Sequence, residues 1–238
     1  MTADTLAQAY ADAASRLAGR TDVLGNTVAL LTDAAALMTA DAAGLLVQRP
    51  TGGLELVACT SHQATELELY ERQVQLGPCS EAISTGRFVS AGPDDLASRW
   101  DGVGQAMLDA GFRRVEAFPV FWRETVLGAL NVFHTEDRLL GPEHERVGAT
   151  FATLAALVLA RPGDLPTGAV QQQVLEALES RVVVEQAKGV LSYVWKVDMA
   201  GAYELLVRAA ADQRRPLAEV AARIVADAGR RGPGGRDR

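Results

Sequence analysis

The stretch SRVVVEQAKGVLSYV, from Ser180 to Val194, lies inside a longer helical pattern that begins near Val170. On a helix of about 3.6 residues per turn, two neighbouring stripes run along this pattern. One stripe consists of Leu175, Leu178, Val182, Gln186 and Gly189, and the other of Val174, Ala177, Arg181, Val184, Lys188 and Leu191. The pattern therefore predicts a long helix with one apolar face. Beside that face, Arg181 and Lys188 point the same way, about 10 Å apart along the axis. This arrangement suits a polyanion better than a small molecule.

The size and composition of the chain are typical of a globular protein with one large domain or two ordinary ones. Its 238 residues are 48% hydrophobic and 22% charged, a balance that argues against general disorder. The sequence contains no run of about 18 apolar residues, so we expect no membrane span. The first residues, MTADTLAQAY, show no secretory signal. Only two cysteines occur, Cys59 and Cys79. We therefore expect no disulfide framework and a cytoplasmic protein.

Charge is distributed unevenly along the chain. Residues 1–166 contain 12 arginines, no lysine and 21 acidic residues, a net charge of −9. Residues 167–238 contain 9 arginines, 2 lysines and 9 acidic residues, a net charge of +2. The asymmetry indicates two units with different partners, although an acidic balance that only aids solubility accounts equally well for the front half.

Residues before about position 160 alternate between helical and strand patterns in the order of an α+β fold. Asp22 is a plausible helix cap, Pro78 opens a short helix that ends at Gly86, and one helical stretch runs from Pro93 to about Ala110. Further helices are predicted at residues 5–18, 22–38, 63–76 and 143–159. Strands are predicted at residues 42–48, 54–60, 88–89, 114–122 and 124–135.

Three segments of this region resemble a GAF domain over roughly residues 20–160. They are GPCSEAISTG (77–86), FPVFWRETVLGALNVF (118–133) and EHERVGATFATLAALVL (143–159). The resemblance implies an antiparallel sheet with helices on both faces, one of which often forms a small-molecule pocket. It also implies a sensory and dimerising role more often than catalysis, and it does not identify a ligand.

The segment RPGDLPTG (161–168) predicts a joint, because it carries two prolines and two glycines. Beyond the opening helix, Asp198 is predicted to cap MAGAYELLVRAAAD, and Pro216 is predicted near the first turn of PLAEVAARIVADAG. The inner sides of these helices are predicted to be Ala202, Leu205, Leu206 and Ala209, and Leu217, Val220, Ala221 and Ile224. The predicted organisation is a sensor-like domain (1–162), a linker (163–169), an all-α three-helix domain (170–228) and a disordered basic tail (229–238).

The three-helix region resembles an ANTAR domain, the RNA-binding output module of bacterial transcription antiterminators, over residues 171–226. The matching segments are ALESRVVVEQAKGVL (177–191), AYELLVRAA (202–210) and RRPLAEVAARIV (214–225). Two departures bear on the fine geometry of an RNA contact. Val207 stands where the family usually has a first arginine, and Arg214 replaces a common asparagine.

This resemblance implies RNA contacts by Arg181, Gln186, Ala187, Lys188, Gly189, Arg208, Arg214 and Arg215. The physical reason is that unstacked loop bases expose their edges to polar side chains, while phosphates need cations. A solvated helix face is the alternative for Arg181 and Lys188, and core packing explains Ala187 equally well. Tyr193, Trp195 and Tyr203 are expected to be buried at the helix junction rather than to stack on bases.

No catalytic or metal-binding arrangement is apparent in the sequence. His62, His134 and His144 lie far apart with no metal-ligand spacing, so we expect no metal and no cofactor. Cys59 and Cys79 are expected to be small buried hydrophobic residues. A helix N-terminus would lower the pKa of Cys79, which leaves a GAF-fold thiol reductase as an alternative.

We therefore expect a signal-responsive antitermination regulator that is a homodimer and not an enzyme. Its C-terminal domain would bind stem-loop RNA, and its GAF-like domain would sense an unidentified small molecule. Pairing of helices along residues 170–192 would connect the two functions, and no membrane is expected as a partner. A DNA-binding regulator is the other alternative, because three helices with a basic edge can mimic a helix-turn-helix.

Overall fold

The computed structural model divides the chain into two compact units, Met1–Leu175 and Glu176–Arg238. The structure describes residues 8, 10–15, 22–49, 52–138, 141–160, 167–213 and 215–230, and the side chains among these except those of residues 167–177. Most of the predicted linker, most of the predicted tail, parts of the first predicted helix and Arg214 lie outside the described residues. No described helix is long and apolar enough to pass through a membrane.

The first unit is built on one antiparallel sheet with the strand order β2-β1-β5-β4-β3. This confirms the predicted sheet. Its strands are β1 (Ala42–Gln48), β2 (Leu54–Cys59), β3 (Val89–Ala91), β4 (Arg114–Trp122) and β5 (Thr125–His134). The turn between β4 and β5 falls at Arg123 and Glu124 as predicted, and Arg123 adopts a left-handed φ of 56° there.

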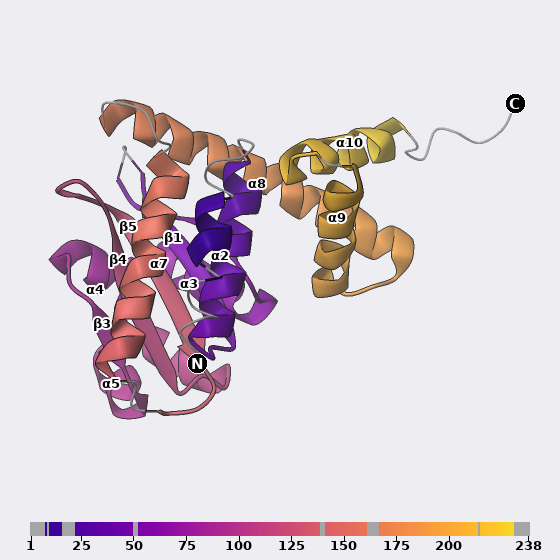
Figure 1. The fold of residues 1–238 in the computed structure, drawn as a ribbon. Helices are drawn as coiled ribbons and strands as arrows, with labels where there is room; N and C mark the ends of the chain where they lie inside the picture. The colour runs from indigo at the N-terminus through magenta and orange to yellow at the C-terminus, as the bar shows by residue number, and fades with distance from the viewer. Residues whose placement is uncertain are drawn as a thin grey trace, which may run out of the picture. The chain divides into compact units, whose positions relative to one another are not determined.

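Helices cover both faces of this sheet, as the GAF resemblance implies. They are α2 (Val23–Leu37), α3 (His62–Val74), α4 (Pro78–Thr85), α5 (Pro93–Ser98), α6 (Val103–Asp109) and α7 (Pro142–Ala160). On one face, α2 and α7 lie side by side over the strands (Figure 1). On the other face, Ala42 and Leu46 of β1 share a core cluster with Leu67 of α3 and Ala82 of α4. Successive residues of a strand point to opposite faces, and both faces of β1 are therefore buried.

Local signals place several helix ends where the sequence predicts them. The Asp22 carboxylate accepts a hydrogen bond of 2.9 Å from the Gly25 amide and caps α2. Pro78 lies in the first turn of α4, which ends at Gly86 with a left-handed φ of 63°.

One helix was predicted after Pro93, and this prediction is wrong because the structure has two. The helices α5 and α6 are separated at Gly102, whose φ is +75°. A Cβ added at Gly104 would lie 1.8 Å from the carbonyl oxygen of Leu96, so the two helices pack backbone against backbone. The break also turns Trp100 inward, where it is 4% exposed.

The second unit contains α9 (Met199–Gln213), α10 (Leu217–Arg230) and most of α8 (Thr167–Trp195). Asp198 caps α9 by accepting a 2.7 Å hydrogen bond from the Gly201 amide, as predicted. The helices α9 and α10 pack against each other (Figure 1). The small core that the three helices share consists of Leu178, Val184, Ala187, Ala202, Leu206, Ala210, Leu217, Val220 and Ala221. Most predicted inner positions are among them, whereas Leu205, Ala209 and Ile224 are only half-buried.

The apolar face of α8 is rotated from the predicted one. Val184 and Ala187 are 4% and 0% exposed, while Val182 is 58% exposed. Gln186, Gly189 and Tyr193 follow Val182 along the helix at steps of four and three, and all are exposed. The stripe of Val182, Gln186, Gly189 and Tyr193, here called the outer stripe, therefore faces away from the core of its unit.

Gly148 allows α7 to approach β4 closely. A Cβ added there would lie 2.2 Å from the ring carbon Cζ of Phe118. Phe118 is 1% exposed and its ring centroid lies 4.6 Å from that of Phe88, so the ring has no room to move aside.

We predict that Gly148→Ala lowers the free energy of unfolding by about 1–3 kcal/mol through overpacking. Urea unfolding of the full chain measures this change. Gly141→Ala is the control, because no atom lies within 4 Å of a Cβ added at Gly141. Equal stability of the two variants would contradict the close approach of α7 to β4.

Candidate functional site

The residues implied in RNA binding differ in their accessibility. On α8, Gln186 and Gly189 are exposed, Arg181 is half-buried, and Ala187 is fully buried. A Cβ added at Gly189 would meet no atom within 4 Å, so the backbone is open to a ligand at that point. The side chain of Ala187 packs inside the unit and takes no part in the surface considered below.

Lys188 lies at the seam between α8 and α9 instead of extending into solvent. Its side chain is 14% exposed, and its Nζ lies 2.9 Å from Oε1 of Glu185. The same Nζ is 5.7 Å from the ring centroid of Tyr203 on α9. Glu185 is 41% exposed. A phosphate that approaches Lys188 would therefore be repelled by the neighbouring Glu185 carboxylate.

The arginines of α9 and of the turn after it are accessible. Arg208 is 74% exposed and pairs with Glu204 at 3.3 Å, and Arg215 is 47% exposed and pairs with Glu219. Exposed pairs of this kind contribute only about 0.3–0.5 kcal/mol. A phosphate can replace either carboxylate at little cost, which makes both arginines suitable for an anionic ligand.

The expected burial of two aromatic residues is wrong. Tyr193 is 76% exposed and Trp195 is 65% exposed. The Nζ of Lys196 lies 4.3 Å from the ring centroid of Tyr193. The chain turns back at Lys196 (φ 54°), and the turn is closed by the Ser192 hydroxyl, which donates to the Val197 carbonyl at 2.7 Å. A unit of three helices has too little interior to cover these rings.

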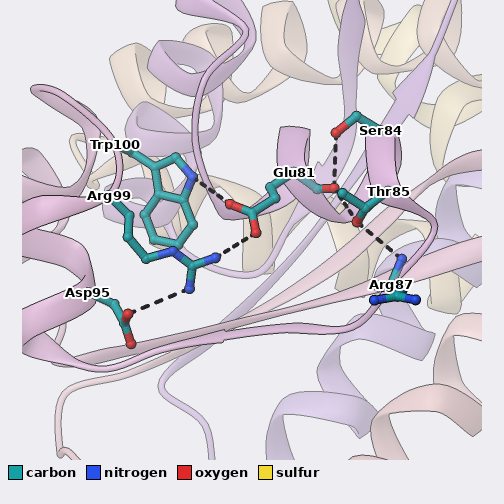
Figure 2. Close-up of polar contacts among 7 residues, drawn as sticks. All are labelled: Glu81, Ser84, Thr85, Arg87, Asp95, Arg99 and Trp100. Atoms are coloured by element: carbon teal, nitrogen blue, oxygen red, sulfur yellow. Dashed lines mark hydrogen bonds and ion pairs between the residues drawn. The ribbon is translucent and has the colours of Figure 1, made fainter.

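In the first unit, a carboxylate anchors α4 to the segment that follows α5. Figure 2 shows Glu81 of α4 facing Arg99 and Trp100. Its Oε1 lies 2.5 Å from Arg99, its Oε2 accepts a 3.2 Å hydrogen bond from the indole of Trp100, and its carbonyl accepts from Ser84 and Thr85. The motif GPCSEAISTG is therefore fixed by its own glutamate.

Two further carboxylates are buried between α3 and the sheet. Glu68 and Glu71 are each 1% exposed. Glu68 accepts a 2.7 Å hydrogen bond from the amide nitrogen of Asn131, and Glu71 accepts one of 2.8 Å from the Ser80 backbone. Burial raises the pKa of Glu71 to about 7, although hydrogen bonds to its carboxylate from the backbone of Ser80 and Cys79 oppose the shift. Burial and the nearby charge of Glu71 also raise the pKa of Glu68 well above its ordinary value.

The surroundings of Cys59 and Cys79 disfavour the reactive thiolate form of both side chains. Burial, together with the charge of Glu68, raises the pKa of Cys59 to about 12. Burial and the charges of Glu71 and Glu68 raise the pKa of Cys79 well above its ordinary value. The expectation that a helix N-terminus lowers the pKa of Cys79 is therefore wrong. The thiolate is the reactive form, so this environment opposes thiol chemistry.

Sequence spacing missed one cluster of possible metal ligands. Glu116 of β4, His134 at the end of β5 and His144 in the first turn of α7 bring three ligand atoms within 4.8 Å of one another. The strand pairing places Arg114 opposite His134, so Glu116 is a diagonal neighbour of His134 on one face. Burial raises the pKa of Glu116, but the two imidazoles beside it lower the pKa below its ordinary value. The register of β4 against β5 is the signal that could have predicted that Glu116 and His134 lie close together.

Two family models match the chain. The model of the GAF domain matches residues 2–160, and that of the ANTAR domain matches residues 172–225. Both are regulatory domains, the first sensory and the second RNA-binding. No curated protein matches the sequence.

Solved structures resemble the first unit in fold. The GAF domain of a phosphoenolpyruvate-protein phosphotransferase from Acinetobacter is 14% identical with a TM-score of 0.52, covering 70% of this chain and 100% of that one. The corresponding domain from Coxiella burnetii is also 14% identical with a TM-score of 0.52, covering 66% of this chain and 94% of that one. A phycoerythrobilin-bound GAF domain from a cyanobacterial phytochrome is 11% identical with a TM-score of 0.50, covering 74% of this chain and 99% of that one. At these identities the likeness shows the fold alone.

The buried carboxylate of Glu71 predicts a pH-dependent stability. Its folded-state pKa of about 7 lies above the ordinary value of 4.5, so its contribution is fully present below pH 4.5 and is lost as the pH rises through 7. We expect Glu71→Gln to remove this loss and to be more stable than the parent chain by on the order of 3 kcal/mol at pH 8.

Urea unfolding at pH 5 and pH 8 measures the difference between the two chains. Glu66→Gln, on the exposed side of the same helix, is the control. If the parent chain and Glu71→Gln lose the same stability between these pH values, the pKa assigned to Glu71 is incorrect.

Proposed function

Because the chain belongs to the GAF family and carries an ANTAR domain after its GAF domain, we propose that it is a signal-responsive regulator of transcription antitermination that binds stem-loop RNA. In this proposal the protein is cytoplasmic, and the GAF domain receives a signal from a small ligand. The observation that carries the RNA-binding role is the polar and cationic surface of α8, α9 and the turn after α9, here called the RNA surface, in which the Lys188 side chain is only 14% exposed. It consists of Arg181, Gln186, Lys188, Gly189, Arg208 and Arg215.

The RNA surface offers two kinds of contact. Arg208 and Arg215 supply cations whose exposed carboxylate partners are weakly held, and such cations bind phosphates regardless of base sequence. Gln186 is an exposed donor and acceptor beside the open backbone at Gly189, and it can reach the edge of an unstacked loop base. Arg214, which the family resemblance adds, lies outside the described residues and remains part of the proposal.

The exposed rings at the end of α8 extend this surface. Tyr193 and Trp195 are 76% and 65% exposed, and Lys196 lies against Tyr193. An aromatic face next to a cation supports stacking of an unpaired base. The mechanism that we propose is therefore recognition of a loop by stacking and by hydrogen bonds, with arginines neutralising the stem.

A homodimer is part of the proposal, and α8 supports it. Val182 is 58% exposed on the outer stripe, where it precedes Gln186 by about one turn. We place the contact between copies at Val182 and toward the start of α8, which leaves Gln186 and Gly189 for RNA. A ligand that favours one arrangement of the two helices over another would then change the placement of both RNA surfaces.

We expect Arg208→Ala to weaken binding of a stem-loop RNA recovered by crosslinking to the full chain. The slope of log K against log salt should fall by about 1, because one phosphate contact is lost. Fluorescence anisotropy at several salt concentrations measures both quantities. Arg138→Ala is a matched control, since Arg138 is 56% exposed and pairs with Glu136 at 3.1 Å in the first unit. Equal effects of the two variants, or tighter binding to duplex DNA than to the stem-loop, would contradict the proposal.

The pairing of Lys188 predicts a change of the opposite sign. Glu185→Gln should tighten RNA binding, because it frees the ammonium group of Lys188 and removes a negative charge beside the phosphates. Lys188→Ala should weaken binding in the same anisotropy assay. Weaker binding by Glu185→Gln would show that the ion pair with Lys188 must stay intact and that the lysine does not serve a phosphate.

For the dimer, Val182→Asp should shift the full chain from dimer to monomer in sedimentation velocity, because it places charge in an apolar contact. Glu179→Asp provides a control at an exposed position less than one turn away. A parent chain that sediments as a monomer, or a variant that remains dimeric, would remove this part of the proposal.

A further inference from the structure

We propose that Glu116, His134 and His144 form a binding site for a divalent transition-metal ion in the first unit. Two imidazoles and one carboxylate meet there from β5, α7 and β4. The site is separate from the buried carboxylates Glu68 and Glu71, because Glu116 lies on the face of the sheet that α7 covers.

The geometry is close to that of a metal site before the ion enters. Nε2 of His144 lies 2.7 Å and Nε2 of His134 lies 3.5 Å from the same carboxylate oxygen, Oε2 of Glu116. With metal–ligand distances of about 2.0–2.2 Å, two tetrahedral ligand atoms are about 3.4 Å apart. His144 must therefore move away from the carboxylate by less than about 1 Å, and His134 already stands at the required separation from that oxygen.

The burial of the three groups indicates a ligand. The side chains of Glu116, His134 and His144 are 3%, 5% and 13% exposed. Nε2 of His134 is buried and has no hydrogen-bond partner among the described residues, although it points to the same oxygen as His144. A buried polar atom without a partner destabilises the folded chain. A metal ion bound to both imidazoles and to the carboxylate would satisfy this atom.

The donor set selects the class of metal. Imidazole suits zinc, iron, copper and nickel, whereas magnesium and calcium prefer oxygen ligands throughout. Three protein ligands leave at least one coordination position open, and His144 keeps the site in partial contact with solvent. A metal bound at Nε2 of His144 requires that nitrogen to carry no proton, so bonds from His144 and Glu116 to the ion replace the hydrogen bond between them.

Close packing holds the ligands in position. His144 and Gly148 lie one turn apart on α7, and Gly148 brings that helix against Phe118, two residues beyond Glu116 on β4. The competing explanation is a hydrogen-bonded network that only joins α7 to the sheet. A network with only this structural role would bind no metal ion, whereas a metal site would bind one when the ion is added.

The test uses the full chain after treatment with a chelator, titrated separately with Zn²⁺, Co²⁺ and Mg²⁺ by calorimetry. We expect one Zn²⁺ and one Co²⁺ per chain, a visible Co²⁺ absorption band, no Mg²⁺ binding, and a higher Tm when Zn²⁺ is present. His144→Gln and His134→Gln should each weaken Zn²⁺ binding by at least about 100-fold, more than is usual for loss of an outer-shell partner.

His62→Gln is the matched control, because His62 is 61% exposed and lies 3.6 Å from Glu66 on α3. Circular dichroism identifies any variant that fails to fold, and the parent chain tests the proposal by itself. Absence of Zn²⁺ binding by the parent chain would overturn the proposal. So would an unchanged affinity in a folded His144→Gln chain, or an equal loss in His62→Gln.

Discussion

The small core of the second unit covers only one side of helix α8 and leaves apolar and aromatic side chains of the outer stripe exposed. The proposed function depends on this exposed side of the helix. Val184 and Ala187 fill the small core of the unit, while Val182, Gln186, Gly189 and Tyr193 face outward. Exposed valine and tyrosine in a regular stripe have no role in the folding of one chain. These side chains have a role if a second copy of the chain and an RNA loop cover successive turns of the helix. In this proposal, the exposed side of α8 is where RNA binding and the contact between two copies of the chain can influence each other.

In the first unit, the sheet is buried on both faces, and most of the buried polar side chains among the described residues gather in two places. Glu68, Glu71 and Asn131 lie on the face covered by α3 and α4, where burial keeps carboxylates protonated toward neutral pH. Glu116, His134 and His144 lie on the face covered by α7. Each cluster is costly in a hydrophobic interior unless it is fully paired. A sensory domain that retains such clusters has sites whose proton or metal occupancy can alter its stability.

Much of the fold could be predicted from local patterns, and the exceptions have physical causes. Asp22, Asp198 and the turn at Arg123 follow from capping and turn chemistry, which acts over a few residues. The break between α5 and α6 depends on the contact of Gly104 with Leu96, and the exposure of Trp195 depends on the size of the unit. Strand register alone brings Glu116 to His134, and neither composition nor spacing carries that information. The pKa of Cys79 was mispredicted because burial beside two carboxylates outweighs the helix N-terminus.

The central claim is that α8 and α9 hold folded RNA. Ultraviolet crosslinking of the full chain in cells, followed by sequencing of the bound RNA and mass spectrometry of the crosslinked peptides, tests it most directly. The account predicts enrichment of transcripts with stem-loops and crosslinks within residues 178–215, including the peptide that carries Tyr193 and Trp195. Crosslinks confined to the first unit, or no enriched RNA, would contradict it.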